Sequence, residues 1–81
     1  MKITKAQGRE CLRLMKEFAE AGEHVYAIGY RSQKVDDALT SIGWCLGDFN
    51  ETCFAEHGDS LDLDEVLTAL AMCAAIAGVK P

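Results

Sequence analysis

Apolar residues that recur at helical spacing in three separate segments are the feature that most limits how this chain can fold. The segments begin near residues 4, 32 and 60. An α-helix turns by about 100° per residue, so apolar side chains three and four positions apart fall on one face. A chain of 81 residues has room for one core. We therefore expect a single all-α domain over residues 1–81, a compact three-helix bundle, to which a short helix between residues 23 and 31 would add a fourth.

The ends of the helices have recognisable signals. Thr4 and Gln7 form a capping-box pattern for a first helix that runs to Ala21. Ser32 is a suitable N-cap for a second helix through about residue 56, and a third helix starts within residues 60–62. Residues 23–31 are interpreted as a helical turn and a connection. The stripes predicted to face the core are Cys11, Leu14, Met15, Phe18 and Ala21; Val35, Ala38, Leu39, Ile42, Cys45, Leu46, Phe49 and Cys53; and Leu63, Val66, Leu67, Leu70, Cys73, Ala74 and Ala77.

The third helix is apolar on both sides in its second half. After Thr68, the side opposite the core stripe carries Met72, Ala75 and Ile76. A helix that is apolar all round should be covered on every side. The cover is either both other helices of the chain or a second chain, and we expect the protein to form a homodimer.

The second predicted helix has an additional face that lies off its core stripe. Gly43 and Gly47, four residues apart, remove the side chains from one groove of this helix, and Trp44 and Phe54 lie beside them. Each glycine costs about 1 kcal/mol relative to Ala in a helix, which a close neighbour would offset. This neighbour is either another helix of the same chain or a partner. In the second interpretation Gly43, Trp44, Gly47 and Phe54 form a partner-binding patch.

The negative charge is concentrated in the second part of the chain. Residues 1–34 contain seven basic and four acidic groups, whereas residues 35–81 contain one basic and nine acidic groups, and the net charge is −5. Some of these carboxylates lie where a helix N-terminus favours them. The alternative interpretation is an acidic surface for a basic partner, with Asp36, Asp37 and Asp48 as binding residues. The negative charge makes direct binding of nucleic acid unfavourable.

The cysteines and histidines do not form a recognisable catalytic or metal site. The four cysteines fall on core stripes, where a free thiol packs as a small hydrophobe. Cys53 and His57 have the spacing of two ligands on one helix, so a small Cys/His metal-binding domain is one alternative. A nucleophile such as Cys53 beside His57 would lack a third, orienting group. We therefore predict no enzyme, no catalytic residues, no cofactor and no metal.

The segment Gly58-Asp59-Ser60-Leu61-Asp62, followed by Glu65 and Ala69-Leu70, resembles the phosphopantetheine attachment region of acyl carrier proteins. The resemblance implies that Ser60 carries the prosthetic group at the start of a helix, in a small, acidic and helical protein. It covers about a dozen residues. In that family further helices follow the attachment site, whereas 21 residues follow Ser60 here. An acyl-carrier-like protein is the other alternative.

The compartment follows from two further features. The basic start of the chain is not followed by an apolar stretch typical of a secretory signal. The longest apolar run, residues 69–79, is shorter than the roughly 20 residues that cross a membrane. We expect a cytoplasmic protein that does not interact with membranes.

The predicted function is that of a non-enzymatic inhibitor or adaptor that binds a larger protein or nucleoprotein complex with a basic surface, such as a phage-type inhibitor of a host defence system.

Overall fold

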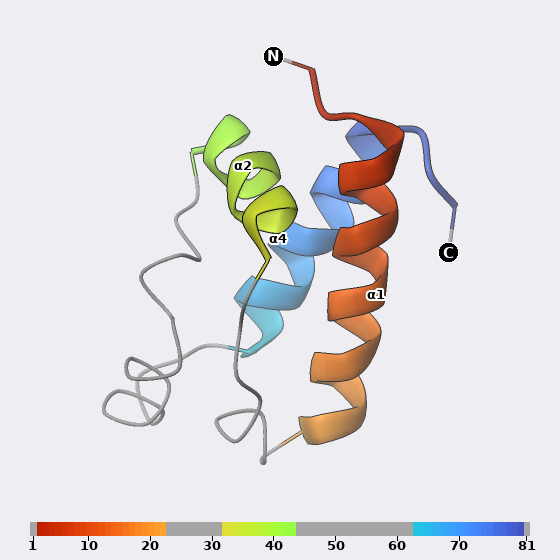
Figure 1. The fold of residues 1–81 in the computed structure, drawn as a ribbon. Helices are drawn as coiled ribbons and strands as arrows, with labels where there is room; N and C mark the ends of the chain where they lie inside the picture. The colour runs from red at the N-terminus through yellow and green to blue at the C-terminus, as the bar shows by residue number, and fades with distance from the viewer. Residues whose placement is uncertain (1, 23–31, 44–62, 81) are drawn as a thin grey trace.

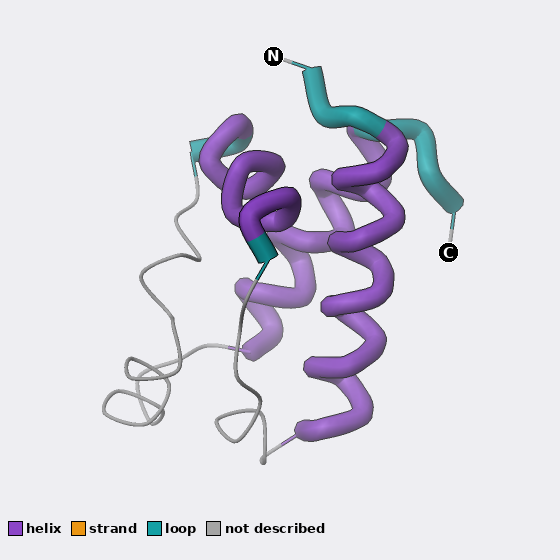
Figure 2. Tube along the Cα trace, in the orientation of Figure 1, coloured by secondary structure: helices purple, strands orange, loops and turns teal. Residues whose placement is uncertain are grey.

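The computed structural model describes residues 2–22, 32–43 and 63–80. These residues form three helices, α1 (Lys5–Ala21), α2 (Gln33–Ser41) and α4 (Leu63–Ile76), which pack around one core (Figure 1). No strand occurs in these three ranges (Figure 2). The predicted all-α fold is therefore confirmed for them. The connection predicted over residues 23–31 lies outside the described residues.

Helix α1 has the ends that its sequence predicts. The Oγ1 atom of Thr4 accepts a hydrogen bond from the backbone N–H of Gln7 at 3.1 Å, and the Gln7 Oε1 accepts one from the backbone N–H of Thr4 at 2.8 Å. This capping box satisfies two donors at the helix start. At the other end Gly22 has a φ of +54°, and its N–H bonds to the carbonyl of Phe18. Residues with this φ are usually glycine, so the helix ends where the sequence predicts.

Helix α2 begins as predicted and ends much earlier than predicted. The Oγ of Ser32 accepts a hydrogen bond from the N–H of Val35, which confirms Ser32 as the N-cap. The helix ends at Ser41, and Ile42 is its C-cap. Gly43 follows with a φ of +81°, and its N–H bonds to the carbonyl of Thr40 at 3.0 Å. The prediction of one uninterrupted helix to about residue 56 is therefore wrong, because the backbone at Gly43 leaves the helical conformation.

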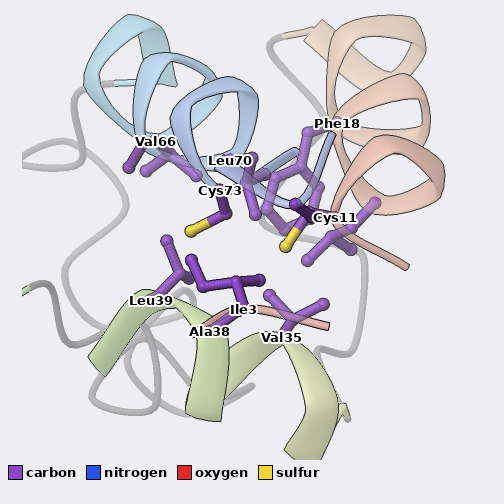
Figure 3. Packing of buried hydrophobic residues seen from close by; sticks show 12 residues of the cluster. Ile3, Cys11, Phe18, Val35, Ala38, Leu39, Val66, Leu70 and Cys73 are labelled. Carbon is purple, nitrogen blue, oxygen red and sulfur yellow. The ribbon is translucent and has the colours of Figure 1, made fainter. Parts of the chain in front are cut away.

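The core lies where the three helices meet (Figure 3). Helix α1 contacts both other helices, and α4 is its main partner. The largest side chains that are fully buried come from all three elements. They are Phe18 and Cys11 of α1, Leu39 and Val35 of α2, and Leu70, Val66 and Cys73 of α4. Most of each predicted stripe that falls within the described ranges is buried, and its remaining members, such as Met15, Ile42 and Leu67, pack partly buried against this core.

The chain after α4 turns back onto α1 through a Schellman motif. The N–H of Val79 bonds to the carbonyl of Ala74, and the N–H of Gly78 bonds to the carbonyl of Ala75, both at 3.0 Å. Gly78 has a φ of +77°, which this motif requires. The turn places Ala77 and Val79 against Gly8 of α1. A Cβ atom on Gly8 would lie 2.6 Å from the Cβ of Ala77 and 2.9 Å from the Cγ2 of Val79. Gly8 is therefore the point of closest approach between α1 and the C-terminal segment.

Candidate functional site

Asp36 and Asp37, two of the predicted partner-binding residues, lie in the first half of α2. Asp36 is half-buried and Asp37 is exposed. The Nε2 of Gln33 donates a hydrogen bond to the Oδ1 of Asp37 at 2.8 Å. The carboxylate of Asp36 belongs to the first turn, where it also stabilises the positive end of the helix dipole. The two side chains thus have a structural role, and the exposed Asp37 adds negative charge to the surface.

Gly43 is the third predicted partner-binding residue within the described ranges, and it does not lie in a groove inside a helix. The sequence pattern predicts Gly43 inside a helix, in a groove that a close neighbour would fill. In the structure it is exposed in the turn after α2, and an added Cβ atom would meet nothing within 4 Å. Gly43 provides a positive φ at a helix end and does not permit close packing. The prediction that Gly43 lies inside a helix is therefore wrong, whereas its part in a partner-binding patch stays a prediction.

The remaining predicted site residues lie outside the described residues. These are Trp44, Gly47, Asp48 and Phe54 of the predicted patch, Cys53 and His57 of the metal alternative, and Ser60 of the carrier alternative. Within the described residues, the candidate site is formed by α4 and the segments beside it.

The outward side of α4 is an open apolar surface. Met72 is 50% exposed and Ile76 is 52% exposed, and they are the large hydrophobic side chains that α1, α2 and α4 leave in solvent. Ala71 and Ala75 are exposed beside them. Within the described residues, α1 and α2 therefore do not cover this side of α4. We call the exposed surface of α4 the α4 face; its residues are Asp64, Glu65, Thr68, Ala71, Met72, Ala75 and Ile76.

An acidic groove lies at the N-terminal end of the α4 face. It is lined by Ile42 of the α2 end and by α4 residues that include Asp64, Glu65, Thr68 and Met72. Both carboxylates belong to the first turn of α4, where the helix dipole favours negative charge. The groove thus combines an apolar wall with two acidic groups, a chemistry that suits a basic side chain with an apolar stem.

A basic groove lies at the C-terminal end of the same face. It is lined by Ile76 and Ala77 at the end of α4 and by residues 2–5 before and at the start of α1. Lys2 and Lys5 are exposed there, whereas Ile3 between them is buried in the core. The buried Ile3 fixes the N-terminal segment beside α4. The α4 face is therefore acidic at one end and basic at the other, with Met72 and Ile76 between.

The buried thiols of the core lack the properties of a reactive site. Cys11 of α1 and Cys73 of α4 are free cysteines within one cluster (Figure 3). Burial, and then the neighbouring Cys73, raise the pKa of Cys11 to about 12. Burial also raises the pKa of Cys73. A nucleophilic cysteine needs a lowered pKa and access to solvent, and these two thiols have neither.

The part of the chain that the structure describes offers no cluster of three or more His, Cys, Asp and Glu side chains that could hold a metal ion. Within the same residues, no helix has the length and apolar character needed to cross a membrane. No family model, no curated protein and no solved structure matches the chain.

The basic groove could not be predicted from the sequence. The approach of Lys2 and Lys5 to α4 depends on contacts between residues that are more than 70 positions apart, and periodicity does not contain this information. The only local signal was Ile3, an apolar residue directly before the Thr4 cap. Such a residue often packs back onto the structure that follows.

Proposed function

We propose that the protein is a non-enzymatic interaction protein that binds a larger protein or nucleoprotein complex as an inhibitor or adaptor. The observation that carries this proposal is the exposure of Met72 and Ile76 on the α4 face. A small chain gains little by leaving large apolar side chains in solvent, and such surfaces in folded proteins are typical of interaction sites. Aliphatic side chains with charged groups around them form the core and rim of many protein interfaces.

The charge of the molecule favours a partner with a basic surface. The net charge is −5, and the acidic groups of α2 and of the first turn of α4 lie close to or at the surface. Complementary charge accelerates association with a basic surface and disfavours acidic partners. An acidic protein of this kind can compete for a site that normally holds nucleic acid. A cytoplasmic inhibitor of a host defence complex, of the phage type, is a function of this class.

The experiment compares capture by the natural chain and by two variants with equal charge. Asp36→Asn/Asp37→Asn removes two carboxylates from α2, and the control Glu17→Gln/Glu20→Gln removes two exposed carboxylates from α1. Each protein is used as bait in lysate of the native host, at low and high salt, and captured proteins are identified by mass spectrometry. We expect the natural chain and the control to enrich the same basic protein or complex at low salt.

The α2 variant should lose most of this enrichment, and high salt should weaken capture by all three proteins. Circular dichroism checks that the variants remain helical. Equal capture by the two variants, or capture that is independent of salt, would contradict the proposed role of the acidic surface.

A further inference from the structure

We propose that two copies of the chain pair through the α4 face in an antiparallel arrangement, with Met72 of each copy at the two-fold axis. This inference rests on the proposed function, because it takes the α4 face as an interaction surface and assigns it to a second copy, which leaves the α2 carboxylates for the larger partner. The argument depends on the order of chemical groups along the face. Asp64 and Ile76 are twelve residues apart, about 18 Å along a helix. Over this distance the face changes from an acidic groove to an apolar centre to a basic groove.

The charges at the two ends of the face fit an antiparallel copy. Rotation by 180° about an axis through Met72 places Thr68 of one copy opposite Ile76 of the other. The same rotation brings the acidic groove of each copy to the basic groove of its neighbour. The carboxylates of Asp64 and Glu65 then meet the ammonium groups of Lys2 and Lys5, at both ends of the interface. In a two-fold interface each favourable contact occurs twice.

A parallel arrangement of the two α4 helices would reverse this advantage. It would place Asp64 and Glu65 of one copy beside the same residues of the other, and like charges across an interface are unfavourable. The antiparallel arrangement also allows close contact at its centre. Ala71 and Ala75 are exposed next to Met72 and have the smallest side chains of the face. Helix axes that are 8–10 Å apart need such small residues where they cross.

The pairing leaves part of the acidic surface available. Asp36 and Asp37 belong to α2 and are not among the residues of the α4 face. A dimer would therefore present these carboxylates twice to a larger basic partner. The occupant of the α4 face and the partner of the α2 carboxylates can consequently be tested separately.

The first test is the molar mass in solution, measured by sedimentation equilibrium over a range of concentrations. We expect a mass that rises toward twice the 8.8 kDa of the chain. Met72→Glu would place two carboxylates at the axis and should raise the dimer dissociation constant roughly 30-fold or more, the effect of losing a central contact of an interface. Ala19→Glu, at an exposed position of α1, is the matched control and should leave the constant unchanged.

The second test distinguishes the antiparallel arrangement from other dimers by exchanging charges. Lys2→Glu/Lys5→Glu should weaken the dimer, and so should Asp64→Lys/Glu65→Lys. Combining all four substitutions in one chain restores opposite charges at both ends of an antiparallel interface. The combined variant should therefore dimerise more strongly than either double variant. Circular dichroism of each variant at low concentration checks that the monomer remains folded.

Three results would overturn the pairing: a monomer at all concentrations, a dimer that Met72→Glu leaves intact, or no recovery in the combined variant. A monomer whose capture of a basic protein still depends on Asp36 and Asp37 would reject the pairing and retain the proposed function. A dimer with salt-independent capture would support the pairing and reject the proposed function.

Discussion

Substitution of Gly8 by Ala tests whether the contact between α1 and the C-terminal segment is as close as the structure shows. In most helices this change is stabilising, because Ala is favoured over Gly by about 1 kcal/mol in a helix interior. At Gly8 the new methyl group would lie 2.6 Å from the Cβ of Ala77 and 2.9 Å from the Cγ2 of Val79. Carbon atoms pack best at about 3.5–4.0 Å, so both contacts are overlaps.

The two overlaps differ in how easily they can be relieved. The Cγ2 of Val79 can move by rotation of its side chain. The Cβ of Ala77 is attached directly to the backbone, so α1 and the C-terminal segment must separate. Extra methyl groups in a packed core typically cost about 1–3 kcal/mol. Because the helix propensity returns only about 1 kcal/mol, we expect Gly8→Ala to lower the free energy of unfolding by up to about 2 kcal/mol.

The assay is thermal and urea unfolding followed by circular dichroism, with Ala6→Gly as the control. Ala6 is exposed two residues before Gly8, so its substitution measures the propensity difference within the same helix. A loss of 1 kcal/mol lowers Tm by about 4–8 °C in a domain of this size. Adding Ala77→Gly to Gly8→Ala should recover part of the loss. A Gly8→Ala protein that gains the stability that Ala6→Gly loses would refute the reasoning.

Three further changes have defined outcomes. Gly78→Ala should destabilise the protein by about 1–2 kcal/mol, because an L-residue is strained at a φ of +77°; urea midpoints equal to those of the natural chain would contradict this. Thr4→Ala should cost about 1 kcal/mol through loss of the cap, and unchanged amide exchange in the first turn of α1 would argue against it. Burial, and then Cys73, raise the pKa of the folded Cys11 from 9.0 to about 12, so the unfolded thiol ionises first and stability should fall as pH rises between these values. Cys11→Ala should reduce this alkaline fall in urea denaturation, and parallel profiles would exclude the thiol as its cause.

The features that the sequence predicted correctly depend on residues that are close together in the chain. Thr4 and Gln7 are three positions apart, and both halves of their capping box form. The stripe of Cys11, Leu14 and Phe18 is buried because one face of α1 meets the other helices. Local spacing determines such features, so no knowledge of the tertiary structure was needed.

The end of α2 could not be predicted from periodicity, because the apolar stripe continues in the sequence beyond Ile42. The positive φ of Gly43 ends the helix, and a glycine is compatible with either conformation. The exposure of Met72 was one of two open possibilities, since apolar composition does not show whether a helix is covered within its own chain. The basic groove with Lys2 required the position of the N-terminal segment beside α4, which only the tertiary structure provides.

The packing of α1 mainly against α4 has a consequence for how the protein folds during synthesis. Helix α1 leaves the ribosome well before its main partner, because α1 ends at Ala21 and α4 begins at Leu63. At about 5–20 residues per second, several seconds separate the two helices. During this interval α2 is the one described helix that can cover the apolar stripe of α1. Pairing of distant segments also slows folding, because a long loop must close before the contact is made. The nascent chain is therefore most exposed to aggregation or capture by chaperones just before α4 emerges.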